Sequence, residues 1–398
     1  MTTPGSASFR HFITPAQYAA KYAPTSTQVA SVEQWLRSSG LRVQSVAAGN
    51  RYVAATGQTA VAERAFGTTL RTYRHAGVTV TAPDTDASVP AELAGVVLGV
   101  TGLDDQPHFE KAGVQGNPPP PAASLRATPC SQYYGQLTAT VGPDGTAIPP
   151  YKGSARPWAT CGYLPQQFNA AYGGAADHLT GKGTTIGISL WYASPTQPAD
   201  ENRFDKTHGF PGLAAGQFET VMPNKPFHRG NVCGEAQEEQ AIDMTSIHDV
   251  APAANIKYYA AASCFDDDIL DTLAQIVDDN KVSVTSNSWG GQLSTETGDA
   301  MLAYEQIFKQ AAMQGQAFFF SSGDNGDWTA AVGHTDYDFP ASDPWVTAVG
   351  GTTMNLDANN NTVWEAGWGY NIVSLQDGKW LPGGDGGRGG RGGRVTVT

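Results

Sequence analysis

The chain has 398 residues, of which 40% are apolar and 15% are charged, so it is long enough for two or more domains with cores of their own. Its net charge of −13 is uneven, since residues 1–103 carry +3 and the remainder carries −16. The acidic remainder argues against nucleic acid as a partner, and the longest apolar run, Leu93–Val100, is too short to span a bilayer.

Residues 8–103 predict a compact α+β unit. Thr14 has the character of a helix N-cap, Pro15 suits the first helical position, and the short helix that follows stops at Pro24. A second helix is expected from Thr25 to Gly40, with one apolar face. Further elements are a helix at 60–67 and strands at 41–48, 51–57, 68–75 and 78–83. This unit shows no catalytic pattern.

The segment 104–150 has the composition of a linker. It centres on the run GNPPPPAAS, and Pro/Gly/Ala-rich sequence of this kind is extended and open to proteases.

From 151 to 380, apolar strands alternate with helices. Strand–helix alternation predicts a parallel α/β sheet, in which loops after the carboxyl ends of the strands are the default place for a site. Two such loops, SNSWGG and SSGDNGD, are rich in Gly and polar residues. Strands are expected at 184–192, 255–262, 282–290, 316–324 and 345–352, with helices around Glu239 and at 266–279 and 297–315. Residues 381–398 form a Gly/Arg-rich low-complexity tail that cannot build a core.

The four cysteines fall into two pairs of equal spacing. Cys130 and Cys161 are 31 residues apart, and so are Cys233 and Cys264. Two sequential disulfides are the simplest of three possible connectivities and would imply an oxidising compartment. Four buried thiols are the alternative, but the turn-rich and polar surroundings favour disulfides.

The segment 234–252 places several acidic residues on one expected helix. Glu235, Glu239 and Asp243 stand four residues apart on an expected helix, where like charges repel by roughly 0.2–0.5 kcal/mol per pair. Solvated acids are the ordinary explanation of such a pattern. Apolar residues nevertheless suggest that part of this helix packs inward, where carboxylates cost more: Ala236, Ile242 and Ile247.

A further acid, Asp324, favours a functional explanation over solvated surface acids. Asp324 follows the apolar strand FFFSS in a glycine-containing turn, where a carboxyl is either a turn former or a site acid. An acid pair on a helix and an acid in a strand-end turn together indicate acid chemistry at low pH.

These motifs, in this order, resemble the sedolisin (serine-carboxyl peptidase) family. The resemblance rests on ExxxD at Glu239–Asp243, on SNSWGG, on SSGDNG and on DFPASDPWVTAVGGT, while FRHFITPAQYAAKYAPT is similar to the family's activation prodomain. It implies a kumamolisin-like proenzyme with an α+β prodomain at 1–103, a linker with the maturation site at 104–150, and a subtilisin-like parallel-sheet peptidase domain at 151–380.

The resemblance also implies roles for three acids. Glu239 would be the general base, Asp243 its hydrogen-bonded partner, and Asp324 the protonated donor of the oxyanion hole. A carboxyl in place of a histidine base moves the working pH down, towards the carboxyl pKa of about 4.3. Glu235 has no family role, and Glu238 is expected in solvent.

The family's serine nucleophile should stand in a GTSxxxP motif after the VGGT strand, and no such motif follows. The only later serine, Ser374, has the wrong flanks. Calcium is expected from the family, but the C-terminal loop that holds it is likewise missing, so no metal ligand is assigned. We therefore expect a C-terminally incomplete peptidase domain, a chain truncated at both ends, and no hydrolysis by this chain as it stands. A frameshift explains the tail better than an RGG-like nucleic-acid binder does.

Two other features are expected to be structural. His248 fits a packing or surface position on its helix better than a catalytic one. The run Asp266–Asp268 could bind a cation, but it also suits the N-terminal turn of a helix, where the macrodipole favours acids.

The function implied is the precursor of a secreted, acid-active serine-carboxyl endopeptidase. Its partners would be protein or peptide substrates and its own prodomain, with a monomer and no nucleic-acid or membrane partner. An extracellular location follows from the family, although the first residues lack a signal-peptide core. The charge split predicts a prodomain attraction that fades as carboxylates protonate. The alternative function is a non-catalytic pseudo-peptidase, or a prodomain-type inhibitor, that binds peptides or related peptidases.

Overall fold

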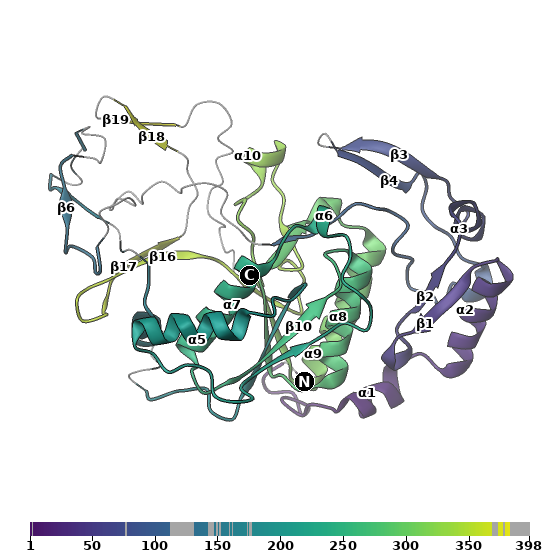
Figure 1. Ribbon diagram of the computed structural model, residues 1–398. Coiled ribbons are helices and arrows are strands. Elements are labelled where there is room, and N and C mark those ends of the chain that lie inside the picture. The colour runs from purple at the N-terminus through teal and green to yellow at the C-terminus, as the bar shows by residue number, and fades with distance from the viewer. Residues whose placement is uncertain are drawn as a thin grey trace.

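A computed structural model gives the fold of the chain (Figure 1). The residues that it describes are 1, 3–75, 78–111, 131–141, 147, 148, 150, 153–158, 160, 162–172, 174, 177–367, 373–376 and 379–382. Cys130 and Cys161, the proline run of the linker and the Gly/Arg-rich tail lie outside the described residues.

The N-terminal region is the expected α+β unit, drawn in purple in Figure 1. Helices α1 (Pro15–Tyr22) and α2 (Ser26–Ser38) each begin with a capping box, in which Thr14 or Thr25 exchanges hydrogen bonds with a glutamine three residues later. The unit also holds α3 (Thr59–Phe66), the 3-10 helices η1 (Ala48–Asn50) and η2 (Ala91–Leu93), and the antiparallel hairpins β1 (Arg42–Val46) with β2 (Val53–Thr56) and β3 (Leu70–His75) with β4 (Val78–Pro83).

This unit has a small core of its own. Leu36, Leu41 and Phe66 are buried, and Trp35 packs edge-on against Phe66 at 5.4 Å between ring centroids. Burial of this apolar surface holds α2 and α3 against the first hairpin.

The larger region is built on a six-stranded sheet with the order β15-β13-β11-β8-β10-β9, in which every neighbouring pair is parallel. The prediction of a parallel α/β sheet is therefore confirmed. Strand β8 lies inside the sheet, and its last residues are wholly buried because helices cover both faces. The strands are β8 (Thr185–Trp191), β9 (Phe218–Val221), β10 (Asn255–Ala261), β11 (Val284–Asn287), β13 (Ala317–Ser321) and β15 (Thr347–Val349).

Two helical layers cover this sheet (Figure 1). Helices α8 (Asp266–Asp279) and α9 (Gly298–Gln314) lie on the face towards the N-terminal unit, while α5 (Gln197–His208) and α7 (Gln237–Val250) lie on the other face. Helix α4 (Pro165–Ala171) packs against α7. The sequence did not predict α5, because its stretch QPADENRFDKTH has no apolar stripe and buries acids instead.

The remaining elements are short. They are β5 (Glu110–Lys111), β6 (Thr138–Ala139), β7 (Arg156–Pro157), α6 (Gly230–Cys233), β12 (Trp289–Gln292), η3 (Leu293–Thr295), α10 (Thr329–Val332), β14 (Asp338–Phe339), and the hairpins β16 (Thr352–Leu356) with β17 (Thr362–Gly367) and β18 (Val373–Gln376) with β19 (Lys379–Pro382). None of the helices in the described part of the chain has the length and apolar character needed to cross a membrane.

The N-terminal unit rests on α8 and α9. Both guanidinium ends of Arg51 bind the carboxylate of Asp278, at 2.7 and 2.6 Å, and the backbone N–H of Val100 donates to Asp299 at 2.8 Å. Among the ion pairs of the described residues, Arg51–Asp278 alone joins residues 1–103 to the acidic remainder. Hydrogen bonds as well as charge therefore stabilise the contact between the N-terminal unit and these two helices.

Candidate active site

Glu239 and Asp243 lie one turn apart in the N-terminal half of α7, and both are buried, with 7% and 6% of their surface exposed. The hydroxyl of Ser288, which follows β11, donates a hydrogen bond to Oδ1 of Asp243 at 2.5 Å. The second oxygen, Oδ2, has no hydrogen-bond partner. A carboxyl held at one oxygen with the other oxygen unpaired can carry a proton at low cost.

Burial raises the pKa of Asp243 to about 7, although the hydrogen bond from Ser288 acts in the opposite direction. In acid, Asp243 is therefore neutral and adds no negative charge beside Glu239. Tyr258 of β10 is within electrostatic range of both. Burial, helped by the charges of Asp243 and Glu239, raises the pKa of this phenol well above its usual range, so it stays neutral.

The structure corrects two expectations about this helix. It begins at Gln237, so Glu235 precedes it and is exposed rather than aligned with the other acids. Ile242 is 59% exposed, so the expected inward position is wrong for this residue. The buried face is instead the one that Glu239, Asp243 and Met244 share, about 100° of rotation away from Ile242. Ala236 is buried, Ile247 is partly buried and Glu238 is exposed, as expected.

Asp324 lies in the turn after β13 and is partly buried. The neighbouring Gly323 has φ +80°, and a side chain there would run into the carboxylate of Asp338, so the turn needs glycine on both counts. Trp328 donates its indole N–H to Asp338 at 3.0 Å. Burial, together with the charges of Glu110 and Asp324, raises the pKa of Asp338 to about 7.

The two predicted groups of acids meet one edge of the sheet. Strands β11 and β13 are parallel neighbours, with Asn287 opposite Phe320. The next residue after Asn287 is Ser288, which holds Asp243, and the turn with Asp324 starts just after β13. Ser288 and Asp324 therefore follow the carboxyl ends of adjacent strands, where sites of open α/β sheets form, and Asp243 is tied to this edge through Ser288.

Three residues of this edge were not assigned from the sequence. Ser288 was quoted only as part of the SNSWGG loop, and Asp338 only as the start of a family motif. Glu110 had no signal at all, because it reaches the site from the linker. Its carboxylate accepts a long hydrogen bond from Asn325 at 3.4 Å, and burial, with the charge of Asp324, raises its pKa.

The linker enters the site region as a strand. β5 pairs antiparallel with β12, with Glu110 opposite Gly290 and Lys111 opposite Trp289. The carbonyl of His108 lies where a side chain at position 291 would project, so the SWGG sequence needs its second glycine for close backbone approach. Phe109 anchors the strand by packing edge-on against Trp289, at 4.9 Å between ring centroids.

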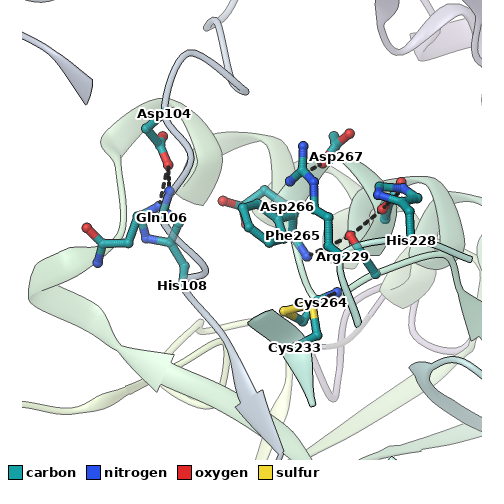
Figure 2. Close-up of polar contacts among 12 residues, drawn as sticks. Asp104, Gln106, His108, His228, Arg229, Cys233, Cys264, Phe265, Asp266 and Asp267 are labelled. Atoms are coloured by element: carbon teal, nitrogen blue, oxygen red, sulfur yellow. Dashed lines mark hydrogen bonds and ion pairs between the residues drawn. A yellow bond between two sulfur atoms is a disulfide. The ribbon is translucent and has the colours of Figure 1, made fainter. Parts of the chain in front are cut away.

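His108 lies among three acids next to this strand: its Nε2 is 3.2 Å from Asp104 (Figure 2), and Asp266 and Glu296 are also near it. Burial acts against protonation, but the hydrogen bond that the imidazole donates to Asp104 and the charges of Glu296 and Asp266 outweigh it and raise the pKa of His108 to about 9. The pKa of Asp266 rises to about 6 and that of Glu296 to about 8, both through burial first. Ligand atoms of His108, Asp266 and Glu296 come within 4.8 Å of one another, and a protonated imidazole there gives the two acids a positive partner.

A disulfide joins Cys233 at the end of α6 to Cys264 just before α8 (Figure 2). Arg229 stacks on Phe265 at 3.7 Å, which fixes the start of α8. The run Asp266–Asp268 forms the first turn of α8, where the helix dipole favours acids.

His248 is a packing residue. It is fully buried, and its Nε2 lies 2.8 Å from the carbonyl oxygen of Pro211.

Comparison with known proteins identifies the relatives of this chain. Residues 1–106 match the pro-kumamolisin activation domain, and residues 195–368, which include all three predicted acids, match the subtilase family. Xanthomonalisin of Xanthomonas sp. (strain T-22) is 27% identical over 96% of this chain and 47% of its own length, and sedolisin of Pseudomonas sp. (strain 101) is 28% identical over 92% and 59%. The chain is a homologue of the sedolisins.

The family resemblance and the order of prodomain and subtilisin-like domain are thereby confirmed. The solved structure of Pseudomonas sedolisin (serine-carboxyl proteinase) is 26% identical, with a TM-score of 0.46 over 56% of this chain and 61% of that one. The chain spans about half to three fifths of the length of these two curated relatives.

Proposed function

We propose that this homologue of the sedolisins is the precursor of an acid-active serine-carboxyl endopeptidase, with Glu239, Asp243 and Asp324 as its catalytic acids. The observation that carries the proposal is the hydrogen bond from Ser288 to Asp243 at the carboxyl end of β11, beside the Asp324 turn after β13. This arrangement gathers one neutral and two further carboxyls at the edge where a peptide bond would be placed.

Glu239 is the proposed general base. It takes the proton of a serine hydroxyl while the serine oxygen attacks the peptide carbonyl carbon, and it returns that proton to the leaving amine nitrogen. Water then releases the acyl group by the same route. No serine of this sequence stands in the family's GTSxxxP pattern, so the proposal leaves the nucleophile unassigned.

Asp243 and Asp324 would act as proton holders. A neutral Asp243 lets Glu239 ionise in a buried place, and its unpaired Oδ2 is available to donate to the base. Asp324 would donate a hydrogen bond from its protonated carboxyl to the tetrahedral oxyanion. Burial raises the pKa of the nearby carboxyls of Glu110 and Asp338, so the surroundings of this turn favour protonated acids, which supports a protonated donor.

The proposed substrate is an extended peptide that pairs with β12. The linker strand β5 already pairs there through backbone hydrogen bonds, which is how sheet edges capture peptides. In this proposal, residues 109–111 block β12 until the linker is cut within 104–150. Acid would favour that release, because protonation of Asp266 weakens its attraction for His108.

An extracellular location is part of the proposal. The Cys233–Cys264 disulfide supports it, since such bonds persist in oxidising compartments.

The deciding assay uses the full-length product of the gene and a quenched-fluorescence peptide between pH 3 and pH 8. Hydrolysis with an acid optimum that Glu239→Gln abolishes, and that the exposed neighbour variant Glu238→Gln keeps, supports the proposal. Equal activity of the two variants would refute Glu239 as the base.

The second candidate function is a non-catalytic peptide binder or prodomain-type inhibitor. The seating of a chain segment on β12 favours it, because that contact needs no nucleophile. Saturable binding of a linker-like peptide by a chain cleaved in its linker, without turnover at any pH, would select this candidate over the peptidase.

A further inference from the structure

A second group of buried acids lies between α5 and the C-terminal half of α7, away from the candidate active site. We propose that Glu201, Asp205 and Asp249 bind a divalent cation of the calcium class between α5 and α7. Glu201 and Asp205 stand one turn apart on α5, and Asp249 is near the end of α7. Ligand oxygens of the three side chains lie within 4.8 Å of one another.

The burial of these acids is nearly complete. Glu201 and Asp249 are each 1% exposed, and Asp205 is 0% exposed. Thr245 donates its hydroxyl to Oε2 of Glu201 at 2.6 Å, but Oε1 of Glu201 and both oxygens of Asp205 and Asp249 have no hydrogen-bond partner. Buried carboxylates with unpaired oxygens are costly, and a bound cation would offset this cost.

The described side chains supply little of that positive charge. No lysine or arginine in the described part of the chain forms an ion pair with these three acids. His248 is the nearest basic group, with Nε2 at 3.4 Å from Asp205. That nitrogen must carry a proton for its shorter contact to the carbonyl of Pro211, at 2.8 Å, so its N–H is used there and Asp205 gains only a longer electrostatic contact.

The donor atoms select the class of cation. Carboxylate oxygens are ligands for hard cations, and two ligands of one Ca²⁺ at about 2.3–2.6 Å are at most about 5 Å apart, which accommodates the observed spread. Mg²⁺ usually keeps several waters in a strict octahedron, and groups this deeply buried leave little room for water. Calcium, which accepts bidentate carboxylates and flexible geometry, fits best.

Such an ion would act on structure rather than on catalysis. Asp249 is ten residues beyond Glu239 on the same helix, a rise of about 15 Å. The ion would fasten the far end of α7 to α5, and so hold the helix that presents Glu239 and Asp243. The inference does not depend on the proposed function, since the three acids belong to neither β11 nor β13.

The test is calcium binding to the whole purified chain after chelator treatment at pH 8, measured by titration calorimetry with CaCl₂ and, separately, with MgCl₂. We expect one Ca²⁺ per chain, weaker binding of Mg²⁺, and a melting temperature that rises with CaCl₂. Asp249→Asn should weaken calcium binding at least tenfold. Asp200→Asn, which removes a partly exposed carboxylate paired with Arg203 on the same helix, should leave it unchanged.

The order of melting temperatures of Asp249→Asn and the parent should also depend on calcium. Without metal, Asp249→Asn should melt at a higher temperature than the parent, because one of three buried like charges is gone; with CaCl₂ the order should reverse. Glu201→Gln repeats the test if Asp249→Asn does not fold. A chain that binds no Ca²⁺, or variants that bind it as the parent does, would overturn the proposal.

Discussion

Helix α7 presents buried acids at both ends, and the two groups differ in their surroundings. Near its start, Asp243 receives a hydroxyl hydrogen bond from Ser288 and lies at the carboxyl edge of the sheet. Near its end, Asp249 faces Glu201 and Asp205 from a neighbouring helix, and neither of its oxygens has a hydrogen-bond partner. Burial and residue type are alike in the two groups.

Burial alone therefore does not distinguish the proposed catalytic acids from the other group. Burial raises the pKa of both Asp243 and Asp249 to about 7. They differ in what they contact: Asp243 is hydrogen-bonded to Ser288 in the loop that leaves β11, while the second group lies between two helices. Four predictions test this division between a reactive end and a structural end of α7.

The largest effect is expected from Glu239→Gln in the full-length gene product. Loss of a general base should lower kcat by about 10²–10⁴-fold at the acid optimum, because glutamine cannot accept the serine proton. Steady-state hydrolysis of a quenched peptide measures it, with Glu238→Gln on the exposed side of the helix as the control. A kcat of Glu239→Gln within threefold of the parent value would contradict a role of Glu239 as general base.

Asp324→Asn should come next, with kcat lower by about 10²–10³-fold, as for removal of one oxyanion donor. The asparagine amide donates a hydrogen bond at every pH, whereas the carboxyl donates only while it is protonated. The remaining activity of the variant should therefore no longer decrease as the pH rises towards neutral. Asp327→Asn, an exposed acid in the same turn, serves as the matched control. Identical pH profiles for parent and Asp324→Asn would contradict a protonated donor.

Asp243→Asn should change how stability depends on pH. The folded pKa of about 7 lies above the unfolded value of about 3.9, so the contribution of Asp243 is complete below pH 4 and is lost as pH rises through 7. A raise of this size corresponds to about 4 kcal/mol, as an order of magnitude. Urea unfolding at pH 4 and pH 8 should show the parent losing more stability than the variant; equal losses would argue against a neutral Asp243.

The smallest effect is expected from Ser288→Ala. Removing this donor should lower the unfolding free energy by about 0.5–1.5 kcal/mol at pH 8. The pKa of Asp243 should rise further, because its carboxylate would then lack a hydrogen-bond donor, as that of Asp249 does. Carbonyl infrared titration of Asp243 would follow the shift. Ser342→Ala, which removes an exposed hydroxyl, provides a control.

Local sequence patterns determined much of this protein. The caps at Thr14 and Thr25, the buried strand β8 and the alternation of strands with helices specify the elements, because helix and strand periods are properties of neighbouring residues. The family motifs likewise located Glu239, Asp243 and Asp324 before any fold was known.

Only the tertiary structure decided which side chains meet. Ser288 and Asp243 are 45 residues apart, Asn325 and Glu110 are 215 apart, and no local period relates them. Helix α5 has no apolar stripe, so its burial, and with it the group around Asp249, depends on how it packs on α7. The exposure of Ile242 has the same cause: the helix turns towards the sheet the face that carries its acids, and packing between distant elements, not the hydrophobicity of one residue, sets that rotation.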